Sequence, residues 1–251
     1  MIALCRDPDY RRALLSAEIA IADSGFMVLL WKFSAGESIP RISGLEHVKR
    51  LLEHESVREP GAVVWVVATE ESKRKLVDFL AEKADSGKLK AKKESSKDEE
   101  KADNGEPTTE SGKLRGTVAS GLRSPISDLG TSAYVAPKYG RPVEDPELLA
   151  LVREQQPRHV VIAVGGGIQD QLGRYLLEQL DYRPAVHCIG AALGFFTGDQ
   201  VRIPDWADRF FLGWLFRAVA QPTVFVPRFW SARRLPWLIW KYRDKLPPLG
   251  A

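Results

Sequence analysis

The run HVVIAVGGGIQDQLG, residues 159–173, limits the possible folds of this chain more than any other stretch. An apolar segment, 159–164, breaks on Gly165, Gly166 and Gly167 and leads into a segment of helical character. A buried strand, a glycine-rich loop and a helix in this order are typical of phosphate-binding units, because the helix N-terminus favours an anion. The run therefore predicts an α/β fold and raises the question of which phosphate the loop binds.

The loop does not match the two common nucleotide-binding patterns. A GxGxxG motif that begins at Gly165 finds its second glycine at Gly167, but Asp170 occupies the third place. The Gly-Lys-Ser/Thr of an ATP-binding P-loop is absent. The loop alone is equally compatible with an anion-binding loop and with a tight strand-to-helix turn, and an NAD-type oxidoreductase is disfavoured.

The rest of the chain alternates apolar runs with amphipathic segments. Asp7 and Asp145 each precede a proline, which is typical of a helix N-terminus. We predict helices from Asp7 to about Ser16 and over 44–55, 70–83, 144–156 and 169–180, and strands over 18–23, 62–68, 131–137, 159–164 and 185–193. The run 25–33 fits a strand or a buried helix. This alternation predicts a Rossmann-like, mainly parallel sheet with helices on both faces and ligands at the carboxyl ends of the strands.

Residues 84–131 interrupt this pattern. They contain no aromatic residue, and the charges of their nine basic and nine acidic residues cancel. Such a segment buries too little apolar surface to offset its ordering entropy, so we predict a disordered, low-complexity insertion. The expected organisation is an α/β domain in two parts, 1–83 and 132–204, followed by a helical, membrane-associating appendage over 205–251.

The end of the chain is basic and aromatic. From Arg202 onward it carries nine Lys and Arg against three Asp and Glu, and it holds five of the seven tryptophans. Aromatic residues beside cations are typical of a membrane interface with anionic lipid. The alternative is a helical lid whose aromatic side chains complete the core. Nucleic-acid binding is disfavoured, because no recognition motif accompanies the charge.

The cysteines and histidines form no recognisable motif. Cys5 and Cys188 are far apart in the sequence, which predicts a reducing, intracellular location and no zinc site. The start at Met1 does not resemble a signal peptide, and no uncharged run is long enough to span a membrane. Four histidines lack a recognisable constellation and are interpreted as structural or surface residues: His47, His54, His159 and His187.

Five short motifs carry a resemblance to a known family. They are IADSG with Asp23, PRISG with Arg41 and Gly44, AVGGGIQDQLG with Gln169 and Asp170, IGAALGFFTG, and RIPDWADRFFLGWLFRAVAQP. In this order and spacing the chain resembles the bacterial WecG/TagA/CpsF glycosyltransferases (glycosyltransferase family 26, the N-acetylmannosaminyltransferase type). The resemblance covers almost all of the chain except the insertion, and its last motif is the most specific.

The resemblance implies an inverting, metal-free transfer of an N-acetylmannosamine-like or related sugar from a UDP-sugar to a polyprenyl-diphosphate-linked acceptor. It places the enzyme at the cytoplasmic face of the plasma membrane, in surface-polysaccharide biosynthesis, with no cofactor and with homo-oligomerisation as an open option. Inversion needs a base for the attacking hydroxyl, and the leaving diphosphate needs compensating charge.

The resemblance also assigns roles to individual residues. Asp23 matches the catalytic base; its alternative role is to cap a turn. Donor or acceptor binding falls to Arg41, Gly165, Gly166, Gly167, Gln169, Arg202, Arg217 and Arg228. Gln169 is expected to contact the nucleotide or sugar, and Arg217 and Arg228 the lipid diphosphate. For each arginine the alternative is a solvated surface position.

Four departures from the family pattern favour a second hypothesis, an inactive relative that acts as a membrane-associated scaffold or partner. A Thr-x-Asn segment of the family would lie upstream of Met1, so either the start is misassigned or a first strand is missing. Gly194 and Gly213 replace two carboxylates of the family. Thr223 and Val224 replace residues that are often basic.

Overall fold

A computed structural model describes residues 2–59, 61–83, 131–195, 219, 222–223, 230 and 232–250. The predicted insertion lies outside the described residues except for Thr131, which begins a strand. Arg202, Arg217, Arg228 and Gly213 also lie outside them, as does about half of the predicted appendage.

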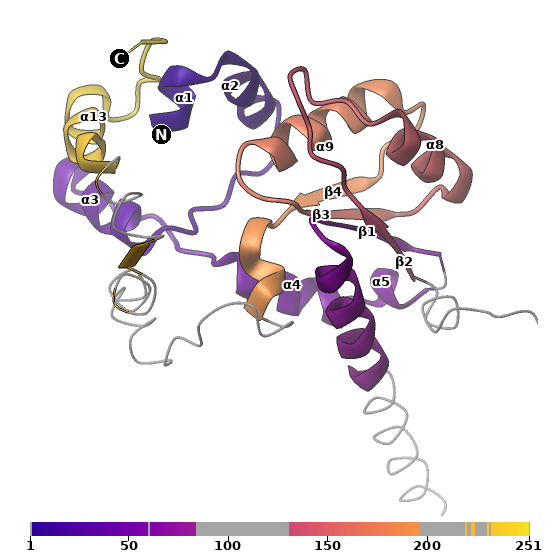
Figure 1. Ribbon diagram of the computed structural model, residues 1–251. Helices are drawn as coiled ribbons and strands as arrows, with labels where there is room; N and C mark the ends of the chain where they lie inside the picture. The colour runs from indigo at the N-terminus through magenta and orange to yellow at the C-terminus, as the bar shows by residue number, and fades with distance from the viewer. Residues whose placement is uncertain are drawn as a thin grey trace, which may run out of the picture.

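The core of the molecule is a parallel sheet of four strands (Figure 1). The strands are β1 (Val63–Val67), β2 (Thr131–Val135), β3 (His159–Ala163) and β4 (Ala185–Cys188), in the order β2-β1-β3-β4. Trp65 of β1 lies in register between Ala133 of β2 and Val161 of β3. The predicted α/β class with a parallel sheet is confirmed.

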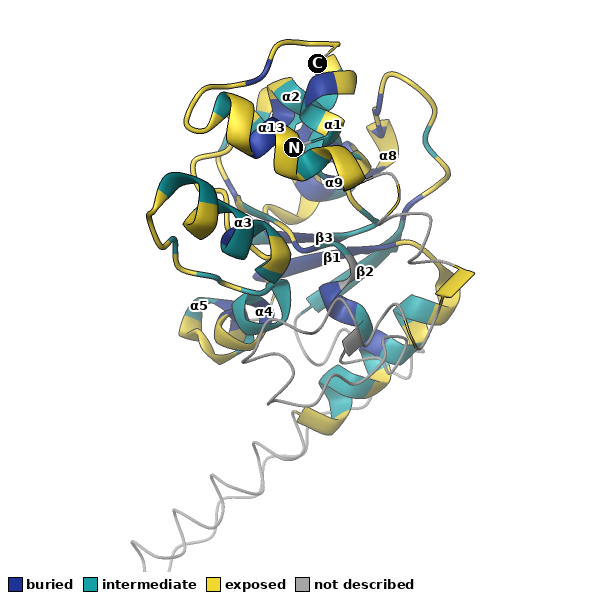
Figure 2. Cartoon of the chain, turned by 90° about the vertical axis from the view of Figure 1, so that its left-hand side faces the viewer, coloured by how far each residue is buried: buried dark blue, intermediate teal, exposed yellow. Residues whose placement is uncertain are grey.

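Helices cover both faces of this sheet (Figure 2). One face carries α4 (Gly44–Glu53), α5 (Glu55–Arg58), a helix over 70–83 and the 3-10 helix η1 (Gly190–Phe195), packed around the buried Trp65. The opposite face carries α8 (Pro146–Gln155) and α9 (Ile168–Gln179). Successive strand residues point to opposite faces, so a strand that is covered on both sides reads as a continuous apolar run.

Both predicted aspartate N-caps are confirmed. Asp7 Oδ1 accepts the backbone N–H groups of Asp9 and Tyr10, each at 3.0 Å, and α2 follows over Pro8–Leu15. Asp145 accepts the N–H of Leu148 at 2.9 Å at the start of α8. These bonds satisfy donors that have no partner within the helix.

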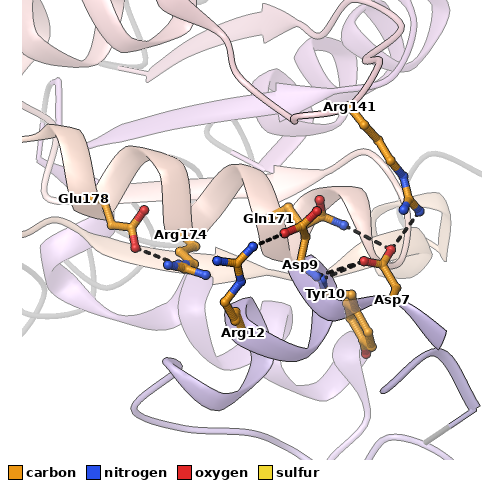
Figure 3. A network of polar contacts seen from close by, with 8 residues as sticks. All are labelled: Asp7, Asp9, Tyr10, Arg12, Arg141, Gln171, Arg174 and Glu178. Carbon is orange, nitrogen blue, oxygen red and sulfur yellow. Dashed lines mark hydrogen bonds and ion pairs between the residues drawn. The ribbon is translucent and has the colours of Figure 1, made fainter. Parts of the chain in front are cut away.

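Asp7 also fastens the N-terminal helices to the domain. Its second oxygen accepts bonds from Arg141 Nη2 at 2.8 Å and from Gln171 Nε2 of α9 at 3.5 Å (Figure 3). Figure 3 shows α2 lying along α9, with the Arg141 side chain reaching the same carboxylate from the loop before α8. One aspartate therefore joins three segments that are far apart in the sequence.

The strand predicted over 18–23 is wrong. These residues are irregular and make no ladder with the described sheet, and Ile19 is 82% exposed. An alternating apolar run forms a strand only where a neighbouring strand accepts its hydrogen bonds. The ambiguous run 25–33 belongs to helix α3 (Gly25–Ala35), which Ser24 caps through a bond from Met27 N–H at 3.3 Å.

The end of the chain returns to its beginning. The 3-10 helix η2 (Ala232–Arg234) leads into α13 (Leu235–Tyr242), which packs against α3 (Figure 1). The N–H of Gly250 donates to the carbonyl of Cys5 in α1 (Ile2–Arg6) at 2.7 Å. None of the helices in the described part of the chain combines the length and apolar character needed to span a bilayer.

Candidate functional site

The glycine loop lies at the carboxyl end of β3, where parallel α/β sheets bind ligands. Gly165 has φ of +114° and Gly167 has φ of +88°, conformations that other residues rarely adopt. A Cβ added at Gly165 or Gly166 would meet nothing within 4 Å. The outer side of the loop is therefore open, with room for a ligand against the backbone.

The start of α9 is already capped by its own carboxylate. Asp170 Oδ2 accepts the N–H of Gly167 at 3.0 Å, and burial raises the pKa of Asp170. Tyr10 of α2 lies 4.0 Å from the Cβ position of Gly167, and burial followed by the charge of Asp170 raises the pKa of Tyr10. Asp170 therefore offsets part of the positive end of the helix dipole, so the loop combines a capped turn with an open outer face.

Gln169 fixes the turn that follows β4. It is only 8% exposed, and its Oε1 accepts the N–H of Gly190 at 2.6 Å. Gly190 has φ of +57°, and a Cβ there would lie 3.6 Å from the Gln169 amide. The carbonyl of Gln169 also accepts a bond from Cys188 Sγ–H at 3.3 Å. Gln169 thus joins the glycine loop to the end of β4.

Asp23 and Arg41 lie together on the other side of the site. Asp23 Oδ1 accepts the N–H of Gly44, the first residue of α4, at 3.3 Å. Arg41 Nε donates to the backbone carbonyl of Asp23 at 3.0 Å. Asp23 is exposed. The sequence placed it at a strand end; the structure instead positions it through the N-terminus of α4, which favours a carboxylate.

A close backbone contact joins these two halves. A Cβ on Gly44 would lie 3.0 Å from Ala192 Cβ and 3.4 Å from the carbonyl of Ile189. Gly44, which binds Asp23, therefore packs directly on the turn that Gln169 binds. Asp23 and Arg41 are thus linked to Gln169, which follows the three glycines, through Gly44 and the Ile189–Ala192 turn. The three remaining arginines lie outside the described residues.

A basic pocket, which the sequence did not single out as a site, lies between α1 and η2. It measures about 350 Å³ and is lined by Arg6, Trp230, Arg233 and Arg234. The guanidinium of Arg233 lies 4.8 Å from the centre of the Trp230 ring. The basic and aromatic composition of the tail signalled three of these residues, but only the fold brings Arg6 to them.

The four histidines, which the sequence analysis interpreted as structural or surface residues without a constellation, are connected in the structure. His47 Nε2 lies 3.1 Å from His187 Nδ1, and His187 Nε2 lies 3.1 Å from His159 Nδ1. His159 Nε2 reaches Ser56 Oγ at 2.8 Å, and Ser56 Oγ reaches His54 Nδ1 at 2.7 Å. The sequence does not reveal this series of hydrogen bonds, because 140 residues separate His47 from His187.

Comparison with known proteins gives one family. The sequence matches the profile of the Glycosyl transferase WecG/TagA/CpsF family over residues 1–104 and 116–248, nearly the whole chain. No curated protein and no solved structure matches the chain.

Proposed function

Because the chain belongs to the WecG/TagA/CpsF family of glycosyl transferases, we propose that it transfers an N-acetylmannosamine-like or related sugar from a UDP-sugar to a polyprenyl-diphosphate-linked acceptor, with inversion. The proposed setting is bacterial surface-polysaccharide biosynthesis on the inner face of the plasma membrane. The proposed reaction uses no metal and no cofactor besides the donor.

The observation that carries this proposal is the contact between Gly44 and the Ile189–Ala192 turn. It links the segment that carries Asp23 and Arg41 to the turn that Gln169 binds at the start of α9, next to the glycine loop. A base beside a diphosphate-binding loop is the arrangement that inverting transfer needs, since the acceptor hydroxyl loses a proton as the UDP leaves.

In the proposed reaction Asp23 takes the proton of the attacking hydroxyl. Its Oδ1 is held by Gly44 N–H, so the carboxylate keeps one orientation while Oδ2 takes no part in that bond. Arg41 and the outer backbone of the glycine loop are proposed to face the donor diphosphate, and Gln169 is proposed to shape the nucleotide side by fixing Gly190. Arg202, Arg217 and Arg228 complete the proposal from the family pattern alone.

The acceptor is proposed to arrive from a membrane that the C-terminal segment contacts. Trp230 is 69% exposed and Trp240 is 64% exposed. Lys241 Nζ lies 4.5 Å from the centre of the Trp237 ring, so cation and aromatic side chains share one surface. The pocket with Arg6, Arg233 and Arg234 adds three cations suited to a lipid phosphate.

UDP binding by calorimetry tests the proposal. We expect UDP to bind and Gln169→Ala to weaken binding about tenfold or more, because Gly190 N–H loses its partner and the loop loses its support. Gln179→Ala, at an exposed position at the end of the same helix, is the matched control. Binding of nicotinamide dinucleotides without UDP contradicts the proposal.

The membrane contact has its own test. We expect Lys241→Gln to weaken binding to vesicles of anionic phospholipid about fivefold, since one cation near the surface contributes roughly 1 kcal/mol. Lys49→Gln, an exposed change on α4, should leave vesicle binding unchanged. Flotation or sedimentation with the vesicles gives both values, and equal loss in both variants contradicts a specific contact.

A second candidate function is that of an inactive relative serving as a membrane-associated scaffold or partner. It is favoured by Gly194, which stands in η1 where the family pattern has a carboxylate. The scaffold predicts UDP or vesicle binding without transfer to any lipid-linked acceptor. Either candidate is compatible with a homo-oligomer, which sedimentation of the whole chain would detect.

A further inference from the structure

The four histidines and Ser56 form one continuous hydrogen-bonded series, here called the histidine chain: His47, His187, His159, Ser56 and His54. It runs between the α4–α5 layer and strands β3 and β4. Its two inner rings, His187 and His159, stack with centroids 5.3 Å apart.

The direction of the hydrogen bonds follows from the His54 end. His54 Nδ1 accepts the backbone N–H of Ser56 at 3.3 Å, and on this bond we assign the unprotonated form to this nitrogen. The Ser56 hydroxyl must then donate its single proton to His54 Nδ1, at 2.7 Å. Ser56 Oγ is left as an acceptor, and the group that faces it, His159 Nε2 at 2.8 Å, must donate.

The same reasoning fixes the remaining rings. A neutral imidazole that donates through Nε2 accepts through Nδ1. His159 Nδ1 therefore accepts from His187 Nε2–H, and His187 Nδ1 accepts from His47 Nε2–H. A proton added to Nδ1 of His187 or His159 would face the Nε2–H of the neighbouring histidine. The inner rings therefore cannot become charged without breaking one of these hydrogen bonds. His47 alone can gain a proton, at Nδ1, and still donate.

The surroundings of the inner rings oppose their protonation as well. His187 faces His47 from α4 and His159 from β3, and η1 on the same face carries no titratable side chain. His159 also faces His54 and Arg158, which is paired with Glu59 at 3.0 Å. Burial, followed by the two neighbouring rings, lowers the pKa of His187 to about 4.

The histidine chain ends directly behind the candidate site. His47 lies about one turn into α4, whose first residue, Gly44, donates its N–H to Asp23 Oδ1. The His47–His187 bond therefore links this end of α4 to β4, three residues before Gly190. In the described ranges no group of three or more His, Cys, Asp or Glu side chains has an arrangement that could hold a metal ion.

We propose that the histidine chain is a pH-sensitive positioning device: while its inner rings are neutral it holds the N-terminus of α4 against Asp23, and protonation of an inner ring releases it. His47 and His187 are thus positioning residues for the carboxylate. The hydrogen-bond direction and the release of α4 stand without the proposed function; only their effect on catalysis rests on it.

Two variants of His47 test the direction of the hydrogen bonds in the histidine chain. His47→Gln keeps an amide N–H donor near the position of Nε2, whereas His47→Leu removes the donor. Long-range 1H–15N spectra of the whole chain should show Nε2–H forms for His47, His187 and His159 at pH 7. We expect the pKa of His187 to rise by at least one pH unit in His47→Leu, a tenfold gain in proton affinity, and to stay low in His47→Gln.

A second readout follows α4 itself. The amide of Gly44 should exchange with solvent at least tenfold faster once the pH falls below the pKa of His187, and this transition should move upward in His47→Leu only. Lys49→Gln, an exposed change on the same helix, is the control. In a transfer assay the acid limb of kcat should move by the same amount, while KM for the donor changes little.

Each negative result has a distinct meaning. An Nδ1–H form at His187 or His159, or an unchanged His187 pKa in folded His47→Leu, would contradict the assigned direction of the hydrogen bonds in the histidine chain. A shifted His187 pKa with Gly44 exchange unaffected overturns the positioning role. Normal His and Gly44 behaviour in a protein without any sugar transfer leaves this inference standing and overturns the proposed function instead.

Discussion

Asp23→Asn should lower the rate of sugar transfer about 10²- to 10⁴-fold, the range that a general base contributes. Asparagine keeps the oxygen that accepts Gly44 N–H, at 3.3 Å in the native protein, so the loop geometry survives while the base is lost. The loss should therefore appear in kcat, and the dissociation constant for UDP should change less than threefold.

The comparison that makes this result specific is Asp181→Asn, which removes an exposed carboxylate from the loop after α9. It should transfer sugar at the native rate. If Asp23→Asn retains more than a tenth of the native kcat, Asp23 is only a capping residue of α4. If both kcat and UDP binding collapse together, the substitution has disrupted the site, and Asp23→Ser becomes the next variant.

Acid should destabilise the folded protein by about 2 kcal/mol between pH 7 and pH 5 through His187 alone. Its pKa is lowered from an ordinary 6.5 to about 4 in the folded protein, chiefly by burial. Between these two values the unfolded chain binds one more proton than the folded protein, so stability falls as the pH falls. Burial also lowers the pKa values of His159 and His47, which act in the same direction.

Urea unfolding at pH 7, 6 and 5 measures this dependence. His187→Phe keeps an aromatic ring in the stack and removes the titration, so its stability should decline less steeply with acid than that of the native protein. Lys49→Gln should follow the native slope. Parallel pH dependences for the native protein and His187→Phe would mean that His187 carries no proton-linked stability.

The sequence predicted those strands and helix starts that depend on residues adjacent in the chain. Strands β1 and β3 are buried on both faces, and such strands read as uninterrupted apolar runs such as VVWVV. An Asp-Pro pair in the sequence predicts the starts of α2 and α8, because the aspartate accepts the first free backbone N–H groups and proline already has a helical φ.

The same reasoning failed for segments whose structure depends on contacts with residues that are distant in the sequence. Residues 18–23 have the apolar content of a strand but no partner strand, and β4 ends at Cys188 because Gly190 turns with positive φ against Gln169. Both outcomes depend on contacts between distant segments, which periodicity does not report.

The candidate site was predictable only in part for the same reason. The resemblance to the family suggested Asp23, Arg41 and Gln169 as site residues. In the fold these residues bind backbone groups on the two sides of the Gly44–Ala192 contact, which the sequence did not predict. The histidine chain and the pocket at Arg6 were missed, since no spacing rule relates His47 to His187 or Arg6 to Arg233. Such clusters exist only after β4 and α4, or α1 and η2, have packed together.

The most direct test of the central claim is a transfer assay with the whole chain, a panel of UDP-sugars and a detergent-solubilised polyprenyl-diphosphate-linked sugar. We expect one donor to yield UDP and a lipid product extended by one sugar, in equal amounts, and only when the lipid acceptor is present. Absence of the extended lipid for every donor, with UDP bound normally, would contradict glycosyl transfer and leave the scaffold as the function of this chain.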